Sequence, residues 1–229
     1  MSVTSQTGRN TMSEPSTSLP RTLWVGVVVL LAFLGLAYLL SVAEYSQAQH
    51  KPPPVLGRIA DFTLTNQDGQ KVTLADLTNR VWVADIIFTR CTASCPIMSS
   101  QMKSLQAALP PDNPARLVSL TCNPSYDSPA VLKRYGERYD ADFHRWIFLT
   151  GTPKELSDLA AGSLKLGATP VPPEQRQNPT DFFIHSTYFV VVDKHARLRA
   201  VFQTEGQGVE WTNVQSHLLA AVRQLEREK

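Results

Sequence analysis

The sequence predicts an α/β domain, a mixed β-sheet flanked by helices, preceded by one transmembrane helix. From Val55 onward, the order of patterns is a hairpin, three strand–helix units, a second hairpin and a final helix. Residues 81–88 form a near-continuous apolar run, as expected for a strand that is buried on both faces. Residues 23–43 carry no charge over 21 positions, which is long enough to cross a bilayer.

The apolar stretch 23–43 is expected to remain in the protein as a membrane anchor. It exceeds the roughly 7 to 15 apolar residues of a signal peptide, but Ser41-Val42-Ala43 resembles a cleavage site, so a cleaved leader is the alternative. Arg9 and Arg21 precede the span and Glu44 follows it, which favours a cytoplasmic N-terminus. The bulk of the chain is then expected on the periplasmic, non-cytoplasmic side, where thiols can be oxidised.

The chain is predicted to have four parts. Residues 1–22 form an N-terminal cytoplasmic tail, 23–43 the anchor, 44–57 a Pro-rich linker and 58–229 the folded domain. Within the linker, Lys51-Pro52-Pro53-Pro54 is typical of a stiff spacer.

Turn and capping signals divide the domain into its elements. The first hairpin is predicted around Asn66-Gln67-Asp68-Gly69, because Asp-Gly is a preferred hairpin turn. Ser128-Pro129 and Thr152-Pro153-Lys154-Glu155 have the residues that begin helices. The expected strands are 62–64, 72–74, 81–88, 116–121, 145–149, 186–192 and 198–202, and the expected helices are 96–109, 128–139, a short one from 153 and a C-terminal one with Val214, Leu218, Val222 and Leu225 on one face.

Two cysteines follow the buried strand, in Cys91-Thr92-Ala93-Ser94-Cys95-Pro96. Proline suits the first position of a helix, so we expect the helix to begin at Pro96. Both thiols would then lie at a helix N-terminus, where the dipole favours thiolate and makes a nucleophile or metal ligand. A structural disulfide or two inert core thiols is the plainer alternative, which the order strand, CxxxC, proline, helix disfavours.

His185 lies far downstream, just before the strand predicted from Ser186, and after a Pro-rich stretch, 167–179, that could let it swing toward the cysteines. Two thiols and an imidazole suit a soft metal ion such as Cu(I), whereas two thiols alone suffice for disulfide exchange. The residues alone leave both readings open, along with a core or surface role for His185.

Composition excludes several classes of function. The 229 residues carry a formal net charge of only +2, and the sequence contains neither a phosphate-binding glycine loop nor a run of basic residues interleaved with aromatics. We therefore expect no nucleic-acid partner. Three cysteines are too few for a disulfide scaffold, so a functional role for them is favoured.

From about Asp61 to the C-terminus, the sequence resembles the Sco/SenC family of membrane-anchored copper proteins. The resemblance implies a thioredoxin-like fold, a copper ion held by Cys91, Cys95 and His185, and a copper-containing subunit of a respiratory oxidase as partner. The matching residues are Asp61-Phe62-Thr63-Leu64, Asp68-Gly69, Phe88-Thr89, Cys91 to Pro96, Asp127-Ser128-Pro129, Leu132, Phe148-Leu149-Thr150-Gly151 and His185-Ser186.

Two positions depart from that family's pattern and change the charge around the implied ligands. Many relatives have Asp-Pro at the end of the second parallel strand, where this chain has Cys122-Asn123-Pro124, and some have an acidic residue where Ile184 stands. The leading interpretation is a copper metallochaperone with no enzymatic activity. The alternative is a thiol:disulfide oxidoreductase that uses Cys91 and Cys95, although no proline precedes Ser186 where such enzymes place one; a structural or interaction module is the third.

Two further residues are candidates for a role near the thiols. Asp85 lies in the buried strand and could accept a proton, or it could be a carboxylate paired elsewhere. Cys122 ends the strand 116–121, which a right-handed crossover would place parallel to the strand before Cys91. We expect Cys122 near the metal site but not as a ligand; a small buried apolar residue is the plainer reading.

Overall fold

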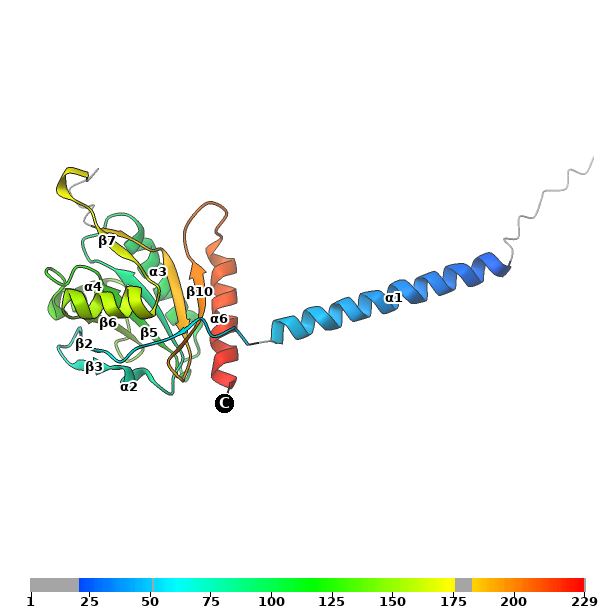
Figure 1. Cartoon of the computed structure of the whole chain (residues 1–229), viewed down its shortest axis with the longest axis horizontal. Coiled ribbons are helices and arrows are strands. Elements are labelled where there is room, and N and C mark those ends of the chain that lie inside the picture. Colours follow the sequence, from blue (N-terminus) through cyan, green and yellow to red (C-terminus); the bar gives the residue numbers. More distant parts are fainter. Residues whose placement is uncertain (1–20, 51, 176–182, 229) are drawn as a thin grey trace, which may run out of the picture. The chain divides into compact units, whose positions relative to one another are not determined.

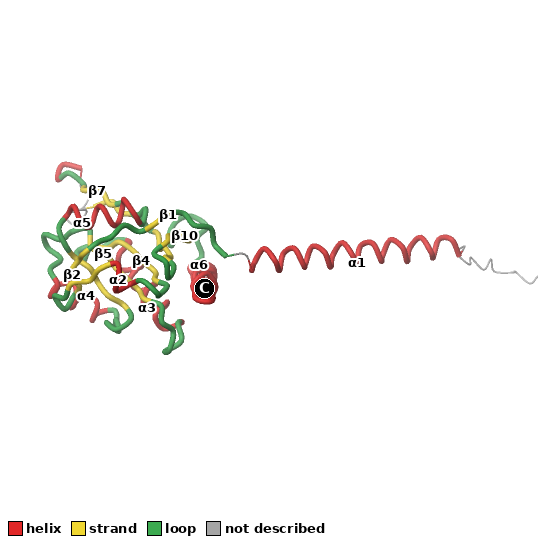
Figure 2. Tube along the Cα trace, turned by 60° about the horizontal axis from the view of Figure 1, so that its bottom comes forward, coloured by secondary structure: helices red, strands yellow, loops and turns green. Residues whose placement is uncertain are grey.

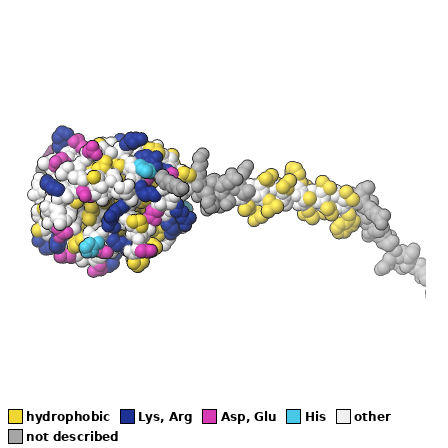
Figure 3. Space-filling model, turned by 90° about the horizontal axis from the view of Figure 1, so that it is seen from below, with side chains coloured by type: hydrophobic (Ala, Val, Ile, Leu, Met, Phe, Trp, Pro, Cys, Tyr) yellow, Lys and Arg dark blue, Asp and Glu magenta, His cyan; other side chains and the backbone are white. Residues whose placement is uncertain are grey.

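The computed structural model describes residues 21–50, 52–175 and 183–228. Contacts divide the chain into two units, Met1–Lys51 and Pro52–Lys229. The described part of the first unit is helix α1 (Arg21–His50), in which Leu23–Val42 is apolar and long enough to cross a membrane. Hydrophobic side chains cover this stretch in Figure 3. The predicted apolar helix is therefore present.

The second unit is built on one large mixed sheet and one small hairpin. Its strands are β1 (Gly57–Arg58), β2 (Thr63–Asn66), β3 (Lys71–Thr73), β4 (Trp82–Ile87), β5 (Arg116–Thr121), β6 (Trp146–Thr150), β7 (Ala168–Pro170), β8 (Phe183–His185), β9 (Tyr188–Val192) and β10 (Arg197–Gln203). Eight of them form a sheet with the order β1-β10-β9-β4-β5-β6-β2-β3, while β7 and β8 pair with each other. Figure 1 labels β10, β5, β6, β2 and β3 of the large sheet and β7 of the hairpin.

Helices cover both faces of the large sheet (Figure 2). They are α2 (Leu74–Leu77), α3 (Ser94–Ala108), α4 (Pro129–Arg138), α5 (Pro153–Ser157), α6 (Trp211–Arg227), a π-helical segment η1 (Asp158–Ser163) and a 3-10 turn η2 (Pro173–Gln175). Apolar residues of α3, α4 and α6 share one buried cluster with the sheet, and those of α2, α5 and η1 share the other.

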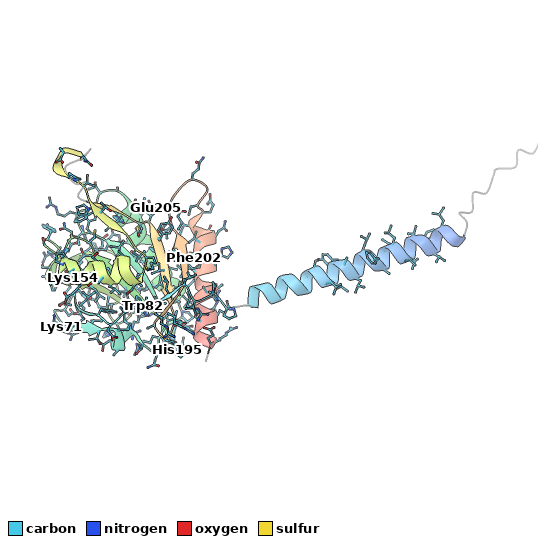
Figure 4. The ribbon with its side chains drawn as sticks, in the orientation of Figure 1. Lys71, Trp82, Lys154, His195, Phe202 and Glu205 are labelled. Atoms are coloured by element: carbon cyan, nitrogen blue, oxygen red, sulfur yellow. The ribbon has the colours of Figure 1, made fainter. Side chains whose placement is uncertain are left out.

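Strand β4 lies in the middle of the large sheet, between β9 and β5, and contributes side chains to both buried clusters. All six of its residues are buried, which confirms the strand predicted from the apolar run 81–88. Trp82 (labelled in Figure 4), Ala84 and Ile86 face the α5 side, whereas Val83 and Ile87 face the α3 side. Each large apolar side chain buried in this way contributes about 1.5–3 kcal/mol to folding, so the strand is fixed from both faces.

The parallel pair that carries the cysteines is also as predicted. Strands β4 and β5 are parallel neighbours, and Ile87 lies opposite Thr121 at their carboxyl ends. The predicted first hairpin forms between β2 and β3, where Gly69 adopts a φ of 78° that favours glycine. The second pairs β9 with β10 across the turn before Arg197.

Helix α3 begins at Ser94, two residues before the start predicted at Pro96. The first turn of a helix has no internal partners for its N–H groups, so a proline is tolerated there beyond the first position. Cys95 consequently lies within the first turn rather than before it. This brings its sulfur closer to the end of β4 than a preceding loop would.

The Pro-rich stretch predicted over 167–179 contains strand β7, and 176–179 lie outside the described residues. Ala168 of β7 pairs with His185 of β8 in an antiparallel hairpin. The strand predicted from Ser186 begins instead at Tyr188, so His185 ends one strand rather than preceding the next.

Candidate metal centre

Three elements bring two sulfurs and one imidazole together at the carboxyl end of β4. Cys91 lies in the loop that follows the strand, four residues after Ile87, Cys95 lies in the first turn of α3, and His185 ends β8. The sulfur and ring nitrogen atoms all lie within 4.8 Å of one another. Among the described residues, this is the one cluster of three or more such side chains that could hold a metal ion.

The imidazole has the tautomer that a metal ligand needs. Nδ1 of His185 lies 3.2 Å from the Ser186 carbonyl oxygen, which can only accept, so Nδ1 carries the proton. In the neutral ring, Nε2 is then the nitrogen without a proton, and it lies 3.0 Å from Sγ of Cys95. A backbone carbonyl thus orients the ring and points its lone pair at the sulfurs, as in known histidine metal sites.

Phe88 forms the wall of the site. Its backbone N–H donates to Sγ of Cys95 at 3.4 Å, and its ring meets the His185 ring edge-on with centroids 5.8 Å apart. The ring of Phe183, which like His185 belongs to β8, lies against the Phe88 ring, and the two ring centroids are 5.5 Å apart. Apolar contacts therefore hold β8 against the end of β4, and Cys95 is completely buried beneath them.

The two thiols have opposite proton affinities. A hydrogen bond from the Cys95 thiol, with support from His185 and from backbone N–H groups, outweighs burial and lowers the pKa of Cys91 to about 4. Burial, with the adjacent Cys91 sulfur, raises the pKa of Cys95 above its usual range. Cys91, which is half-buried, is therefore the thiolate of the pair.

His185 gains a proton more readily than an ordinary histidine. Burial alone lowers the pKa of His185, but the Cys91 sulfur, the Ser186 carbonyl and the Asp85 carboxyl outweigh it, so the net pKa is raised. In the metal-free site, the Cys91 thiolate therefore stabilises the protonated form of the His185 ring, which has to release its Nε2 proton before that nitrogen can bind a metal ion.

The buried carboxylate of Asp127 fixes the loop before Cys91. In the sequence, this residue stands out only as part of the motif Asp127-Ser128-Pro129. Asp127 is completely buried and accepts hydrogen bonds from the backbone N–H of Thr89 at 3.2 Å and from its hydroxyl at 2.5 Å. The Thr121 hydroxyl donates to the same carboxylate at 2.5 Å. Asp127 therefore ties the end of β4 to the end of β5. The sequence signal was its place directly before the helix-starting Ser128-Pro129.

Asp85 lies inside the domain, on the α3 side of β4, opposite Ser119. Within the described part of the chain, neither of its carboxyl oxygens has a partner with hydrogen-bond geometry, and the Ser119 hydroxyl accepts from the Trp146 indole. Burial raises the pKa of Asp85 to about 7, against the lowering effect of nearby Ser119 and His185. It is not paired elsewhere, and its role as a proton acceptor stays a prediction.

Cys122 lies beside the centre but outside its ligand set. Its backbone N–H donates to the Ile87 carbonyl at 2.9 Å, which places it level with the end of β4. Burial and the nearby Asp127 charge raise the pKa of Cys122 to about 12, so it stays a thiol at neutral pH. Its side chain borders an apolar cavity of about 240 Å³ together with Phe183.

The Asp127 tie can be tested by stability. We expect Asp127→Ala to lower the free energy of unfolding by about 2–4 kcal/mol, because three donors lose their buried acceptor. Thr89→Val removes only one of those donors and should cost about 1 kcal/mol. Urea unfolding of the metal-free protein measures both, and equal stability of Asp127→Ala and the unaltered protein would contradict the assignment.

The thiol assignment predicts selective alkylation. In the reduced, metal-free protein, iodoacetamide should modify Cys91 with a rate that levels off above a midpoint near pH 4, since its pKa is lowered to about 4. Cys95 and Cys122, whose pKa values are raised, should remain unmodified at pH 6. Peptide mapping by mass spectrometry identifies the labelled residue; a midpoint at the ordinary thiol value of about 8.5 would refute the assignment.

Comparison with known proteins supplies the family. Residues 53–219 match the family model described as SCO1/SenC. The SCO1 protein homolog of Bacillus subtilis (strain 168) is 39% identical over 114 residues, which are 49% of this chain and 59% of the relative. The chain therefore aligns with less than two thirds of that relative's length.

Solved structures share the fold. BsSco, a Sco-family cytochrome c oxidase assembly protein with a disulfide switch, is 31% identical with a TM-score of 0.61 over 76% of this chain and 97% of that one. Copper-bound yeast Sco1 is 22% identical, with a TM-score of 0.60 over 77% and 96%. The predicted thioredoxin-like fold is confirmed, and the chain, in which Cys91, Cys95 and His185 cluster, belongs to the SCO1/SenC family.

Proposed function

We propose that this protein is a membrane-tethered metallochaperone that binds one copper ion and delivers it during assembly of a respiratory oxidase. The observation that carries the proposal is the convergence of Cys91, Cys95 and His185, whose ligand atoms lie within 4.8 Å of one another. Each residue comes from a different element, and each has its own hydrogen bonds or packing contacts, so the cluster is a built site.

The donor set fits copper. Thiolate sulfur is a soft ligand that selects Cu(I), and imidazole is intermediate, so the site would accept copper in either oxidation state. Cys91 is already a thiolate in the metal-free protein, and neutral His185 offers the lone pair of its Nε2. Cys95 has to lose a proton when the ion binds, and protonated His185 does so as well, since the pKa of each is raised.

Delivery of the ion would occur by ligand exchange. Cys91 is half-buried, so a thiolate of an acceptor can approach the ion from its side. His185 belongs to the small β7–β8 hairpin rather than to the large sheet, so it can leave the ion without breaking the main ladder. The acceptor gains ligands while the donor site loses them, and copper needs no change of oxidation state.

The cellular setting is also part of the proposal. Helix α1 contains an apolar stretch that can span a bilayer, which supports a single anchor. Arg9 and Arg21 before that stretch favour a cytoplasmic N-terminus and hence a periplasmic domain. BsSco is described as belonging to a family of cytochrome c oxidase assembly proteins. We infer that the copper-containing subunit of a respiratory oxidase is the partner here.

The thiol asymmetry also favours a second function, thiol:disulfide exchange. The Cys91 thiolate would attack a partner disulfide, forming a mixed disulfide and releasing one partner thiolate. Cys95, after losing its proton, would then attack Cys91 Sγ, which releases the reduced partner and leaves a Cys91–Cys95 disulfide. The protein is oxidised by two electrons in this step, so an external thiol reductant must restore it.

We expect the reduced protein, purified in detergent, to bind one copper ion per chain. Cys91→Ser or Cys95→Ser should abolish binding, since one thiolate with an imidazole leaves a soft ion short of ligands. His185→Ala should weaken copper binding by at least about 10- to 100-fold, because the loss of a residue that only supports a metal ligand already weakens binding by that factor. Metal analysis and competition with a chelator of known affinity measure these changes.

His217→Ala serves as the matched control for that experiment, because this histidine is exposed on α6 and outside the cluster. Unchanged copper content in both cysteine variants would refute the metallochaperone. Normal copper affinity in His185→Ala, combined with loss of reductase activity, would make thiol:disulfide exchange the primary function.

The third cysteine gives a separate prediction. Cys122→Ser should leave the stoichiometry at one copper per chain, because the Cys122 thiol lies outside the ligand cluster. In the air-oxidised protein, mass spectrometry should find a dominant Cys91–Cys95 disulfide with Cys122 alkylatable after unfolding. A dominant disulfide between Cys122 and either ligand cysteine would overturn this assignment.

A further inference from the structure

We propose that a groove between α4 and the loop before Cys91 is the docking site for an acidic segment of the protein that exchanges metal with this domain. The arginine groove, as we name it, is lined by Arg90, Tyr126, Val131, Arg134, Tyr135 and Arg138, and has a volume of about 630 Å³. That the bound protein is a metal acceptor rests on the proposed function. That the groove prefers acidic segments rests on the residues of the groove alone.

One face of α4 forms the floor of the arginine groove. Val131, Arg134, Tyr135 and Arg138 are spaced i, i+3, i+4 and i+7, so they lie along the same side of the helix. This stretch rises about 10 Å, which matches three to four residues of an extended peptide. The groove therefore has the length of a short linear segment.

The charge in the groove is strongly positive. Arginines supply three of its lining side chains, and Glu137 is its one acidic lining residue. Among ion pairs between described residues, none involves Arg134 or Arg138. The neighbouring cation Lys133 is already paired with Asp68 at 2.8 Å. The uncompensated charge thus belongs to the groove, and it complements carboxylates.

Aromatic rings hold the guanidinium groups in place before a ligand binds. The Arg138 guanidinium lies 4.9 Å from the centre of the Tyr135 ring, and Arg90 lies at the same distance from Tyr126. A guanidinium over a ring loses little further freedom when its N–H edge binds a carboxylate. Tyr126 is 48% exposed, so an approaching peptide can also contact its ring.

The groove extends to the residue before the candidate metal centre. Arg90 directly precedes Cys91, and Asp127 holds the adjacent Thr89 by two hydrogen bonds. A peptide that lies along α4 and passes Arg90 would bring its next residues to the half-buried Cys91 thiolate. Acidic residues beside the metal ligands of an acceptor are therefore the segment that this geometry fits.

The position of the tether favours a protein partner over a lipid surface. The linker enters the domain at Pro53, whose carbonyl accepts a hydrogen bond from Arg199 at 2.8 Å. The neighbouring Leu198 pairs with Val192, which pairs with Trp82 at the start of β4. The tether therefore joins at the opposite end of the central strands from the arginine groove.

The test measures peptide binding to the full chain in nanodiscs of zwitterionic lipid, without metal. The probe is a short fluorescein-labelled peptide of alternating Glu and Ser, which contains no copper ligand of its own apart from carboxylates; a Gln and Ser peptide is its neutral counterpart. Fluorescence anisotropy should show binding of the acidic peptide only, and this binding should weaken as ionic strength rises.

Arg134→Gln combined with Arg138→Gln should weaken that binding about five- to tenfold, the product of losing two exposed charge contacts. Arg223→Gln combined with Arg227→Gln is the matched control, because these exposed arginines have the same i, i+4 spacing on α6 and the same effect on net charge. The control pair should leave binding unchanged. Arg134→Gln alone, which keeps the contact between Arg138 and Tyr135, should weaken it about two- to threefold.

Several outcomes would overturn the proposal. Absence of acidic-peptide binding, equal binding of the neutral peptide, or equal loss in both double variants would each do so. Vesicles that contain phosphatidylglycerol provide the other arm: binding to them that needs Arg134 and Arg138, without peptide binding, would assign the groove to anionic lipid instead. Because no arm contains copper, a failure of copper binding would refute the metallochaperone separately.

Discussion

The Asp127 carboxylate is the interaction on which the rest of the site depends. It accepts hydrogen bonds from Thr89 and from Thr121, so it joins the loop after β4 to the carboxyl end of the parallel strand β5. The loop it fixes presents Arg90 to the groove and Cys91 to the metal centre. A single buried acceptor thereby holds the loop that carries both a proposed copper ligand, Cys91, and a residue of the proposed docking groove, Arg90.

The hydrogen bond from the Cys95 thiol to Cys91, together with the burial of Cys95, gives the two thiols opposite proton affinities. Cys95 is completely buried under Phe88 and keeps its proton, whereas Cys91 is half-buried and loses it. The same asymmetry serves either proposed chemistry, since a thiolate is both a metal ligand and a nucleophile. What separates the two functions is the imidazole, which contributes to metal binding but takes no part in thiol exchange.

Local patterns predicted the parts of the fold in which burial is regular. The apolar run of β4, the strand β5 and the cysteine loop could be located because both strands are continuous and the loop has its own motif. The β7–β8 hairpin could not, because each strand is three residues long, β7 ends in proline, and His185 pairs with Ala168 far away in sequence. The tie made by Asp127 was equally out of reach, since a buried acceptor is recognised only by the donors that the fold brings to it.

The linker is fixed to the domain at the end of the sheet that lies away from the candidate metal centre. Arg199 is buried and binds Pro53, Asp193 and Glu228 together, which clamps the incoming chain to the sheet. Figure 4 shows His195 and Glu205 at opposite ends of the β9–β10 hairpin, and the clamp lies toward His195, away from the metal centre. The length of β4, about 20 Å, thus separates the clamp from the end of the strand that leads to Cys91. Under the proposed tethering, the linker would confine the domain near the membrane, so an acceptor in the same membrane would meet the domain at a raised effective concentration rather than by free diffusion.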